Sequence, residues 1–413
     1  MLKKLTIRNF KAIQDMTIEF TPLTVLIGEN SCGKSTVLQA IDFLRSAASR
    51  DIPEYLREKK WSFEELKSKC NDGKSKPIEF ITLWDLLIKG QSETLEWTLS
   101  VDYNKGWVIK EKLIKPADSK PIISYRNNDQ ENIPASLKQL SIQSSALKYL
   151  SGISMEFDEL NALFFFLSDS ANFELLSPDK MRDGKKLPYA QGIGIGGEAL
   201  AYCINKMNDS DRKLLNKTVS DLIHSVVEII TIDNGNKIDL LAVFISDNNI
   251  MTVDSLHISD GLLRIIAFVV ITMERKMHYF SAEDGFRIEL TSGEECIESN
   301  KILKSGMILL DEIENGINPY LTEKIISLLR NFVIECNRQL ILTTHSPVML
   351  NDIKPEEIIF LWKDDKSSTK SKKFFCNEEM KSLLEALNPG EVWVNLEKDD
   401  ILERLSSDKA GDK

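Results

Sequence analysis

The start of the chain contains three short runs in which apolar side chains predominate, followed by a segment with a different period. Residues 5–10, 16–20 and 23–28 each include β-branched residues and end near a turn, which predicts three strands. Residues 35–44 then place apolar side chains at helical spacing. A short glycine-containing segment joins the third strand to this helix.

The middle of the chain has a weaker pattern. Residues 77–87 and 92–103 alternate between apolar and polar positions, which predicts antiparallel strands with one exposed face. From about residue 116 to residue 235 the pattern is mixed and more helical, with a helix expected over 211–230. We interpret this region as an insertion that forms a lid or an arm.

A regular alternation of strands and helices returns after residue 236. The expected strands are 237–246, 249–256, 307–310, 339–344 and 357–362, and the expected helices are 261–276 and 323–334. Such alternation predicts an α/β fold with a mostly parallel or mixed central sheet. The predicted domains are an N-terminal lobe with an antiparallel β subdomain (1–115), a largely helical insertion (116–235) and a C-terminal lobe (236–413).

Composition places the chain among ordinary globular proteins, with 42% hydrophobic and 28% charged residues over 413 positions. The formal net charge is −11, so the chain has no overall positive field that would attract nucleic acid. DNA binding is therefore possible but is not indicated by the net charge. Six cysteines form no CxxC pair, which fits a reducing compartment. There is no signal-peptide pattern and no apolar run long enough to span a bilayer, so we expect a cytoplasmic protein without a membrane partner.

Two segments carry weak signals. Residues 50–75 are polar and rich in lysine, and are predicted to form a solvated excursion rather than a nucleic-acid contact. Residues 192–197, GIGIGG, superficially resemble a dinucleotide-binding fingerprint but follow no clear strand. They are predicted to form a flexible turn before a helix at 198–204.

Residues 28–36, GENSCGKST, match the phosphate-binding pattern G-x-x-x-x-G-K-[ST] between a predicted strand and a predicted helix. Backbone N–H groups and the helix dipole make such a P-loop an anion site. Lys34 is expected to reach the β- and γ-phosphates of ATP, and the Ser35 hydroxyl is expected to bind Mg²⁺. Cys32 is interpreted as a small filler, because nothing nearby marks it for activation. The predicted nucleotide contacts of the loop are Gly28, Glu29, Asn30, Ser31, Cys32, Gly33, Lys34, Ser35 and Thr36.

Two acids follow the apolar run 307–310. In a chain with a P-loop, Asp311 is expected to hold the Mg²⁺ shell and Glu312 to orient or deprotonate the attacking water. His345 stands where the predicted strand 339–344 stops, at the sheet edge where ligand sites of α/β folds form. A histidine there can hydrogen-bond a γ-phosphate, and it loses this contact when the phosphate leaves.

Ser259, Asp260 and Gly261 open the helix predicted from residue 261. A helix N-terminus with a serine hydroxyl can be a second anion site, although an ordinary helix cap has the same pattern. Lys34 and Asp311 are 277 positions apart, which is more chain than small P-loop kinases and GTPases usually need between these motifs. One group of P-loop proteins has such a layout, and in that group the second anion site faces the γ-phosphate held by a partner subunit.

With these motifs the sequence resembles the ABC-type ATPase heads of the RecF, SMC and OLD group. Residues 2–44 look like the start of those proteins, and 257–268 look like their signature motif. Residues 309–319 look like Walker B running into the D-loop, and 340–347 look like the switch-histidine segment. Residues 382–395 are similar to bacterial OLD-like ATPases, so the resemblance covers roughly 1–50 and 235–395.

The resemblance implies an ABC-type head that closes as a dimer around ATP and Mg²⁺. Ser35 and Asp311 would hold magnesium, Glu312 would be the catalytic acid, and His345 would be the γ-phosphate switch. Ser259, Asp260 and Gly261 would act on the nucleotide of a partner subunit. By the same resemblance, Asn315 and Asn318 would lie near the dimer seam, and Lys11 would touch the nucleotide.

Some features depart from this group. Gln91 is only a candidate for the Q-loop glutamine, and residues 278–305 form an additional segment, predicted to contain a hairpin, between signature and Walker B. The long heptad runs of SMC coiled coils are missing. The 68 residues after His345 are too few for the Toprim nuclease domain of OLD nucleases.

Three functional hypotheses follow. The first is an ATPase switch subunit, a homodimer or higher homo-oligomer, that controls a separately encoded nuclease or toxin in bacterial antiphage defence. The second is a RecF-like ATPase for DNA repair or maintenance. The third is a slow ATP-gated scaffold that sequesters a partner.

Overall fold

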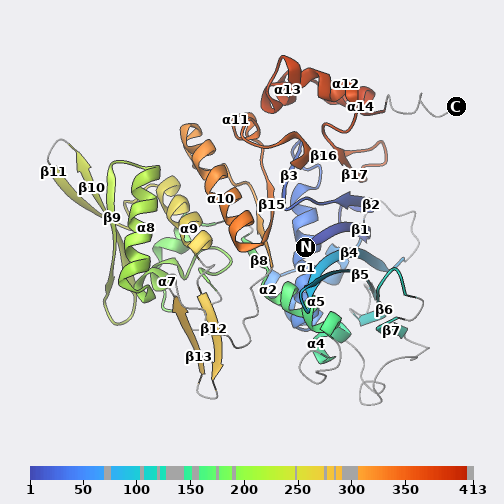
Figure 1. Ribbon diagram of the computed structural model, residues 1–413, viewed down its shortest axis with the longest axis horizontal. Helices are drawn as coiled ribbons and strands as arrows, with labels where there is room; N and C mark the ends of the chain where they lie inside the picture. The colour runs from blue at the N-terminus through green and yellow to red at the C-terminus, as the bar shows by residue number, and fades with distance from the viewer. Residues whose placement is uncertain are drawn as a thin grey trace.

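The computed structural model describes residues 1–68, 76–102, 107–118, 121–126, 144–150, 158–173, 176–187, 192–246, 249–273, 277–282, 285–290 and 306–406. It confirms the predicted α/β class, with a mixed central sheet and an antiparallel sheet formed mainly by N-terminal strands. Figure 1 shows these two sheets at one end of the molecule and a smaller sheet with helices at the other.

The antiparallel sheet has six strands in the order β2-β1-β4-β5-β6-β7. Its strands are β1 (Leu2–Phe10), β2 (Ile13–Glu19), β4 (Ile78–Ile88), β5 (Gln91–Asp102), β6 (Trp107–Ile114) and β7 (Ile123–Arg126). In β4 every second side chain is buried, which is the alternation that predicted this strand.

The central sheet has the order β17-β16-β3-β15-β14-β8. Its strands are β3 (Leu23–Gly28), β8 (Ala171–Phe173), β14 (Met307–Leu310), β15 (Gln339–Thr343), β16 (Ile358–Lys363) and β17 (Thr369–Lys373). All neighbours pair in parallel except β16 and β17. Every residue of β3 is buried, as expected for a parallel strand covered on both faces.

Helices cover the sheets from several sides. Among the described residues they are α1 (Lys34–Ser49), α2 (Ile52–Lys59), α3 (Phe63–Leu66), α4 (Ala146–Leu150), α5 (Asp158–Ser168), α6 (Pro178–Arg182), α7 (Leu200–Lys206), α8 (Asp209–Leu222), α9 (Asp260–Met273), α10 (Thr322–Cys336), α11 (Pro347–Leu350), α12 (Glu378–Ser382), α13 (Pro389–Asn395) and α14 (Lys398–Ser406). One core joins the antiparallel sheet, α1 and α5 to Leu26 of β3, and a second core joins α9 and α10 to Val25 on the opposite face of β3.

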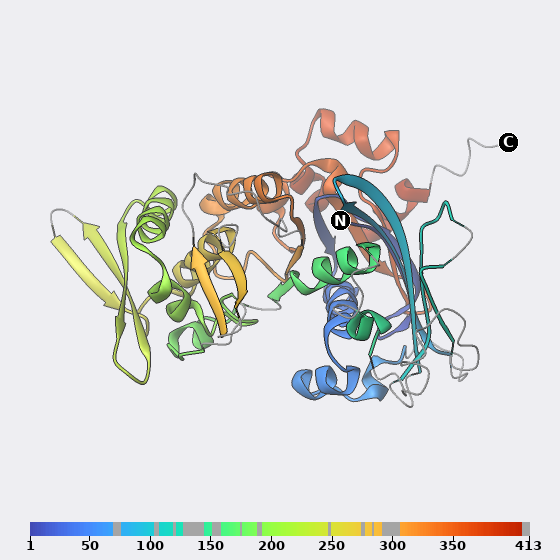
Figure 2. The same ribbon diagram turned by 60° about the horizontal axis from the view of Figure 1, so that its bottom comes forward.

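A third sheet, β9 (Val226–Asp233), β10 (Ile238–Ser246) and β11 (Asn249–Asp254), packs on α7 and α8. Both views place it at the end of the molecule far from the antiparallel sheet (Figures 1 and 2). The hairpin expected after the signature helix is present as β12 (Met277–Ala282) and β13 (Gly285–Leu290), and residues 291–305 lie outside the described part.

Two sequence expectations were wrong. The helix expected over 211–230 ends at Leu222, and β9 begins at Val226. The β-branched residues after Leu222 are compatible with the period of a helix and with that of a strand. Pairing with β10 stabilises the strand. The polar region 50–75 is more than a solvated excursion, because α2 and α3 bury Tyr55 and Leu66 in the core. Residues 69–75 lie outside the described part.

Residues 116–235, which were predicted to form a largely helical insertion, also contribute strands that the sequence did not indicate. β7 pairs with β6 at the edge of the antiparallel sheet, and β8 pairs in parallel with β14 at the edge of the central sheet. Residues 192–197 lie in turns before α7, as predicted. The three-domain division itself stays a prediction.

Candidate nucleotide site

Three neighbouring parallel strands deliver the predicted site residues to one edge of the central sheet. The P-loop begins at Gly28, the last residue of β3, whereas Asp311 follows β14 and His345 lies two residues after β15. Parallel strands end at the same edge, so these segments meet although they are distant in the sequence.

Lys34 is the first residue of α1 and is only 6% exposed. Its Nζ donates to the carbonyl oxygens of Gly28 and Glu29, each at 3.0 Å. Burial lowers the pKa of Lys34, while Asp311 and Glu312 act to raise it. The ammonium therefore lies within the loop, close to the two acids that follow β14, where a phosphate group can replace its carbonyl partners.

Asp311 is held by hydroxyl groups. Thr343 Oγ1 donates to Asp311 Oδ1 at 2.5 Å, and the Ser35 hydroxyl also hydrogen-bonds the carboxyl group. Burial raises the pKa of Asp311, opposed by these two hydrogen bonds. Hard oxygen donors brought together in this way fit Mg²⁺, so the residues present suit the metal that the sequence predicted.

Glu312 has a backbone conformation that non-glycine residues rarely adopt, with φ of 47°. Its N–H donates to Thr343 Oγ1 at 2.8 Å, and Asn315 Nδ2 donates to Glu312 Oε2 at 2.6 Å. Thr343 thus bridges Asp311 and Glu312, and Asn315 orients the carboxylate. Strained backbone held by such contacts is common at functional sites.

His345 lies close to this group. Its backbone N–H donates to Glu314 Oε1 at 2.5 Å. Burial and the nearby Lys34 lower the pKa of His345, which favours the neutral imidazole at neutral pH. The other oxygen of Glu314, Oε2, is buried without a hydrogen-bond partner.

The signature segment is exposed at Ser259 and Asp260 and packs on the D-loop of the same chain. Ser259 Oγ accepts the N–H of Leu262 at 3.3 Å, so it does cap α9. A Cβ on Gly261 would lie 2.1 Å from the carbonyl oxygen of Gly316, a close approach that only glycine permits.

Two arginines surround Asp260. Arg182 of α6 forms an ion pair with it at 2.5 Å. Arg264, one turn further along α9, interacts electrostatically with Asp260 and also with Glu312 and Glu314. Burial lowers the pKa of Arg264, and its Nε atom has no hydrogen-bond partner. The signature helix is therefore connected through charge to the Walker B acids of its own chain.

The other predicted contacts differ in their surroundings. Glu29, Asn30 and Ser31 are exposed at the turn of the P-loop, whereas Cys32 is buried and burial raises the pKa of its thiol. Lys11 donates to Gln39 Oε1 of α1 at 2.8 Å and lies over the Trp61 ring, with its Nζ 3.1 Å from the ring centroid.

Gln91, the Q-loop candidate, is exposed at the tip of the β4–β5 hairpin and pairs with Ile88. Asn318 accepts the N–H of Tyr320 as the cap of a short 3₁₀ turn, Pro319–Leu321.

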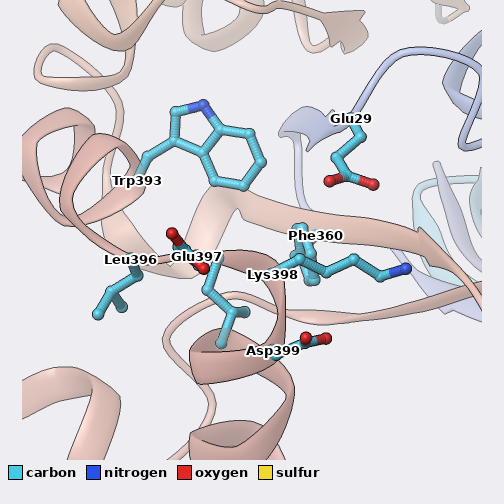
Figure 3. A pocket seen from close by; sticks show the side chains of 8 residues that line it. Glu29, Phe360, Trp393, Leu396, Glu397, Lys398 and Asp399 are labelled. Carbon is cyan, nitrogen blue, oxygen red and sulfur yellow. The ribbon is translucent and has the colours of Figure 1, made fainter.

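A pocket of about 670 Å³ adjoins the P-loop. It lies between Glu29 and the C-terminal helices, with Phe360 of β16 at its base and Trp393 of α13 on one wall (Figure 3). Leu396, Glu397, Lys398, Asp399 and Ile401 complete its lining. The C-terminal segment that resembled OLD-like ATPases therefore lies beside the nucleotide loop.

The sequence did not reveal Thr343, Glu314, Arg182 or Arg264 as members of the site. Thr343 could have been found, because it ends the strand that leads to His345. Arg182 carried no signal, since its contact with Asp260 spans 78 residues of sequence.

Comparison with known proteins agrees with the geometry. Residues 1–258, more than half of the chain, match the AAA ATPase domain family AAA_15. The chain belongs to this family. As an AAA ATPase domain protein it is an ABC-type ATPase of the RecF, SMC and OLD group, which confirms the resemblance seen in the sequence.

Two relatives of this AAA ATPase domain protein match short segments. The OLD nuclease of Thermus scotoductus is 43% identical over 44 residues, which is 11% of this chain and 8% of the relative. The DNA replication and repair protein RecF of Lactococcus lactis subsp. cremoris is 33% identical over 67 residues, which is 16% of this chain and 19% of the relative. The chain thus matches less than a fifth of the length of either relative.

The fold extends over more of the chain. The Smc head bound to the C-winged helix domain of ScpA superposes with a TM-score of 0.53 and 12% identity, covering 90% of this chain and 97% of that head. This likeness establishes the head fold of the AAA ATPase domain protein. In the described residues we find no helix of the length and apolarity needed to cross a membrane.

Proposed function

We propose that the protein is an Mg²⁺-dependent ATPase switch subunit whose heads dimerise around ATP. The observation that carries the proposal is the meeting of Lys34, Asp311 and Glu312 at one edge of the central sheet. This arrangement supports phosphate binding, metal binding and activation of water at one place.

The proposed chemistry is the hydrolysis of ATP. Lys34 would bind the β- and γ-phosphates, and Ser35 and Asp311 would hold Mg²⁺, which would supply positive charge to neutralise those phosphates. Glu312, oriented by Asn315, accepts the proton of the attacking water. The water oxygen bonds to the γ-phosphorus, the bond to the bridging oxygen breaks, and ADP and phosphate leave. The neutral His345 side chain is suited to contact the γ-phosphate.

Dimerisation is supported by the exposure of two segments that a nucleotide could connect. The turn Glu29–Ser31 of the P-loop and Ser259–Asp260 of the signature are both exposed. In the proposed dimer, the signature segment of each copy meets the nucleotide that the other copy holds. Closing two heads over two nucleotides makes association depend on ATP.

The output of the switch is proposed to be a separately encoded nuclease or toxin in the cytoplasm of a bacterium, in antiphage defence. The resemblance to OLD-like ATPases supports this choice, together with the short match to a relative named as a nuclease. Head closure would change the affinity for the effector, a coupling that typically amounts to about 1–3 kcal/mol.

The test is to purify Glu312→Gln from its own host with Mg²⁺ and ATP and to determine the native mass. We expect a mass at least twice that of the nucleotide-free protein, together with a second protein in fixed proportion. Lys34→Met in the same background is the control, and its mass should not respond to ATP. An unchanged mass without a second protein contradicts both the dimer and the effector.

The match to RecF supports a second candidate, an ATPase for DNA repair or maintenance. This candidate requires ATP-dependent binding to duplex DNA that weakens steeply with added salt. The net charge of −11 argues against it. If Glu312→Gln with ATP retains a DNA duplex at 50 mM but not at 200 mM salt, this second function replaces the effector switch. If instead the wild-type protein and Glu312→Gln keep an ATP-dependent complex equally long, the slow scaffold is favoured.

A further inference from the structure

Asp260 places a negative charge where the proposed function needs to receive an anion. It is the first residue of α9, and its side chain is 61% exposed beside the exposed Ser259. In the proposed dimer this segment meets the γ-phosphate of the nucleotide bound by a second copy. A carboxylate repels a phosphate at such close range, so the site requires a compensating cation.

Arg182 provides that cation from a different segment of the chain. Its Nη2 donates to Asp260 Oδ1 at 2.5 Å and to the Ile258 carbonyl at 2.9 Å, and its Nε donates to the Ser255 carbonyl at 3.1 Å. Its side chain is 17% exposed, so these contacts are partly shielded from water. One guanidinium therefore holds the loop before α9 and neutralises the first carboxylate of the helix.

Other charged groups lie near Asp260 and Arg182. Arg264 lies one helical turn away and also attracts Asp260. Arg182 has a second carboxylate partner, Asp179, at 3.3 Å, but the Asp179 side chain is 97% exposed, and exposed pairs contribute little. Because Arg264 also interacts with Glu312 and Glu314, Arg182 is the cation that compensates the Asp260 carboxylate, which favours an incoming anion at Ser259.

The glycine-rich segment 192–197 explains why α6 can bring Arg182 to this place. A Cβ on Gly197 would lie 2.7 Å from Cγ of Met181, and φ of Gly197 is +86°. The N–H of Ser177, which precedes α6, donates to the Gly196 carbonyl at 2.9 Å. The segment that resembled a dinucleotide fingerprint therefore lets α6 pack closely, next to the residue that touches the signature.

We propose that Arg182 is a positioning residue of the signature segment, where it cancels the charge of Asp260 so that Ser259 and the start of α9 accept the terminal phosphate of a nucleotide held by a second copy. The inference rests on the proposed ATP-dependent dimer. It assigns a role in nucleotide recognition to α6, a helix between the two lobes that carry the P-loop and the signature.

The test uses the full chain in the Glu312→Gln background and measures ATP-dependent association by native mass over a range of protein concentrations. Arg182→Met keeps the aliphatic stem and removes the charge, so we expect about tenfold weaker association, the usual loss for a charged hydrogen bond. Arg182→Lys should retain most of the association. Adding Asp260→Asn to Arg182→Met should restore it, because the repulsive charge is then gone.

The matched control is Arg212→Met. Arg212 also donates to two backbone carbonyls, those of Met207 and Asn205, but within the α7–α8 region. It should associate like the parent. Binding of a fluorescent ATP analogue to each dilute monomer should not change, since Arg182 acts on the other copy's nucleotide.

The outcomes separate this inference from the function on which it rests. If the parent protein does not associate with ATP, the proposed dimer fails and the role of Arg182 fails with it. If the parent associates and Arg182→Met associates equally well, only the role of Arg182 is overturned. If Arg182→Met is weak and Asp260→Asn does not restore it, charge compensation is overturned, because a purely structural clamp would behave in that way.

Discussion

The residues around Lys34 lie at the ends of buried parallel strands, whereas those around Ser259 lie on an exposed turn held by side chains from another segment. We call the first group the P-loop half-site; it comprises Lys34, Ser35, Asp311, Glu312, Thr343 and His345. The signature half-site comprises Ser259, Asp260 and Gly261 with Arg182 and Arg264. The P-loop half-site is fixed by the core. The signature half-site begins α9, whose apolar residues belong to the second core, but Ser259 and Asp260 themselves are exposed, and Asp260 is held by the ion pair with Arg182.

This difference predicts that substitutions in the two half-sites have different effects. Those in the P-loop half-site should impair nucleotide binding or hydrolysis in the isolated monomer. Those in the signature half-site should leave monomer binding intact and weaken association. The following predictions test this distinction, from the largest expected effect to the smallest.

Lys34→Met should raise the dissociation constant for ATP by roughly 100-fold, because one side chain loses several charge-assisted contacts with phosphate. Titration of a fluorescent ATP analogue measures it. The control is Lys324→Met, since Lys324 is exposed and donates only to the Asp221 carbonyl among its described contacts. Equal affinities for the two variants would contradict the assignment of Lys34.

Asp42→Asn should weaken the helix that carries the P-loop lysine. Asp42 is buried and bonds Arg45 at 2.8 Å, Lys59 at 3.1 Å and the Tyr55 hydroxyl at 3.0 Å. Burial raises its pKa, but the two cations prevail and lower the pKa to about 2. From this shift we expect the free energy of unfolding to fall by roughly 2 kcal/mol at neutral pH.

The sign of the pH dependence follows from the lowered pKa. The folded state prefers the ionised carboxylate, so its contribution is complete above about pH 4, the unfolded value. It is lost as the pH falls toward about 2. Urea unfolding of the wild type and Asp42→Asn should therefore give a gap, the difference between their free energies of unfolding, that is constant from pH 7 to 5 and smaller at pH 3. A gap that does not change with pH would refute the charge assignment.

Gly261→Ala should weaken ATP-dependent association by about tenfold or more without changing ATP affinity in the monomer, because its Cβ would displace the signature from Gly316. The control is Gly235→Ala, where φ of +83° strains the backbone but a Cβ meets nothing within 4 Å, so it has a backbone cost without a clash. Native mass against protein concentration is the measurement. Loss of monomer binding in Gly261→Ala would show that the two half-sites are not separable.

Thr343→Val should have the smallest effect, a several-fold fall in the rate of ATP hydrolysis with ATP affinity nearly unchanged. The change keeps the shape of the side chain but removes the hydroxyl that bridges Asp311 and Glu312. Single-turnover hydrolysis measures it. Thr344→Val is the matched control, because the Thr344 hydroxyl accepts only the Ser346 N–H among the described contacts.

Apart from Thr343, the P-loop half-site could be predicted from the sequence because each of its motifs follows a local apolar run. Lys34, Asp311 and His345 come just after strands of the central sheet, and parallel strands must end at one edge. The identity of the two acids after β14 needed no knowledge of tertiary contacts. The same reasoning gave the α/β class.

The rest depends on contacts that no local pattern shows. β8 is only three residues long, too short for a periodicity, and it exists because it pairs with β14. The segment after Leu222 is compatible with helix or strand until β10 lies beside it. The pairing of Arg182 with Asp260 depends on the placement of α6, which the sequence alone did not specify.

The central position of β3 has a consequence for biosynthesis. Its two neighbours, β15 and β16, lie more than 300 residues later in the sequence. The N–H of Leu2 in β1 likewise donates to a late residue, Gln339, at 2.9 Å from its Oε1. In a nascent chain β1 can pair with β2 and β4 early, whereas the buried strand β3 lacks both of its neighbours until most of the protein has been made, which favours slow folding and exposes the chain to aggregation. The P-loop, which continues from β3, therefore has both neighbouring strands beside it only once residue 363 has been made.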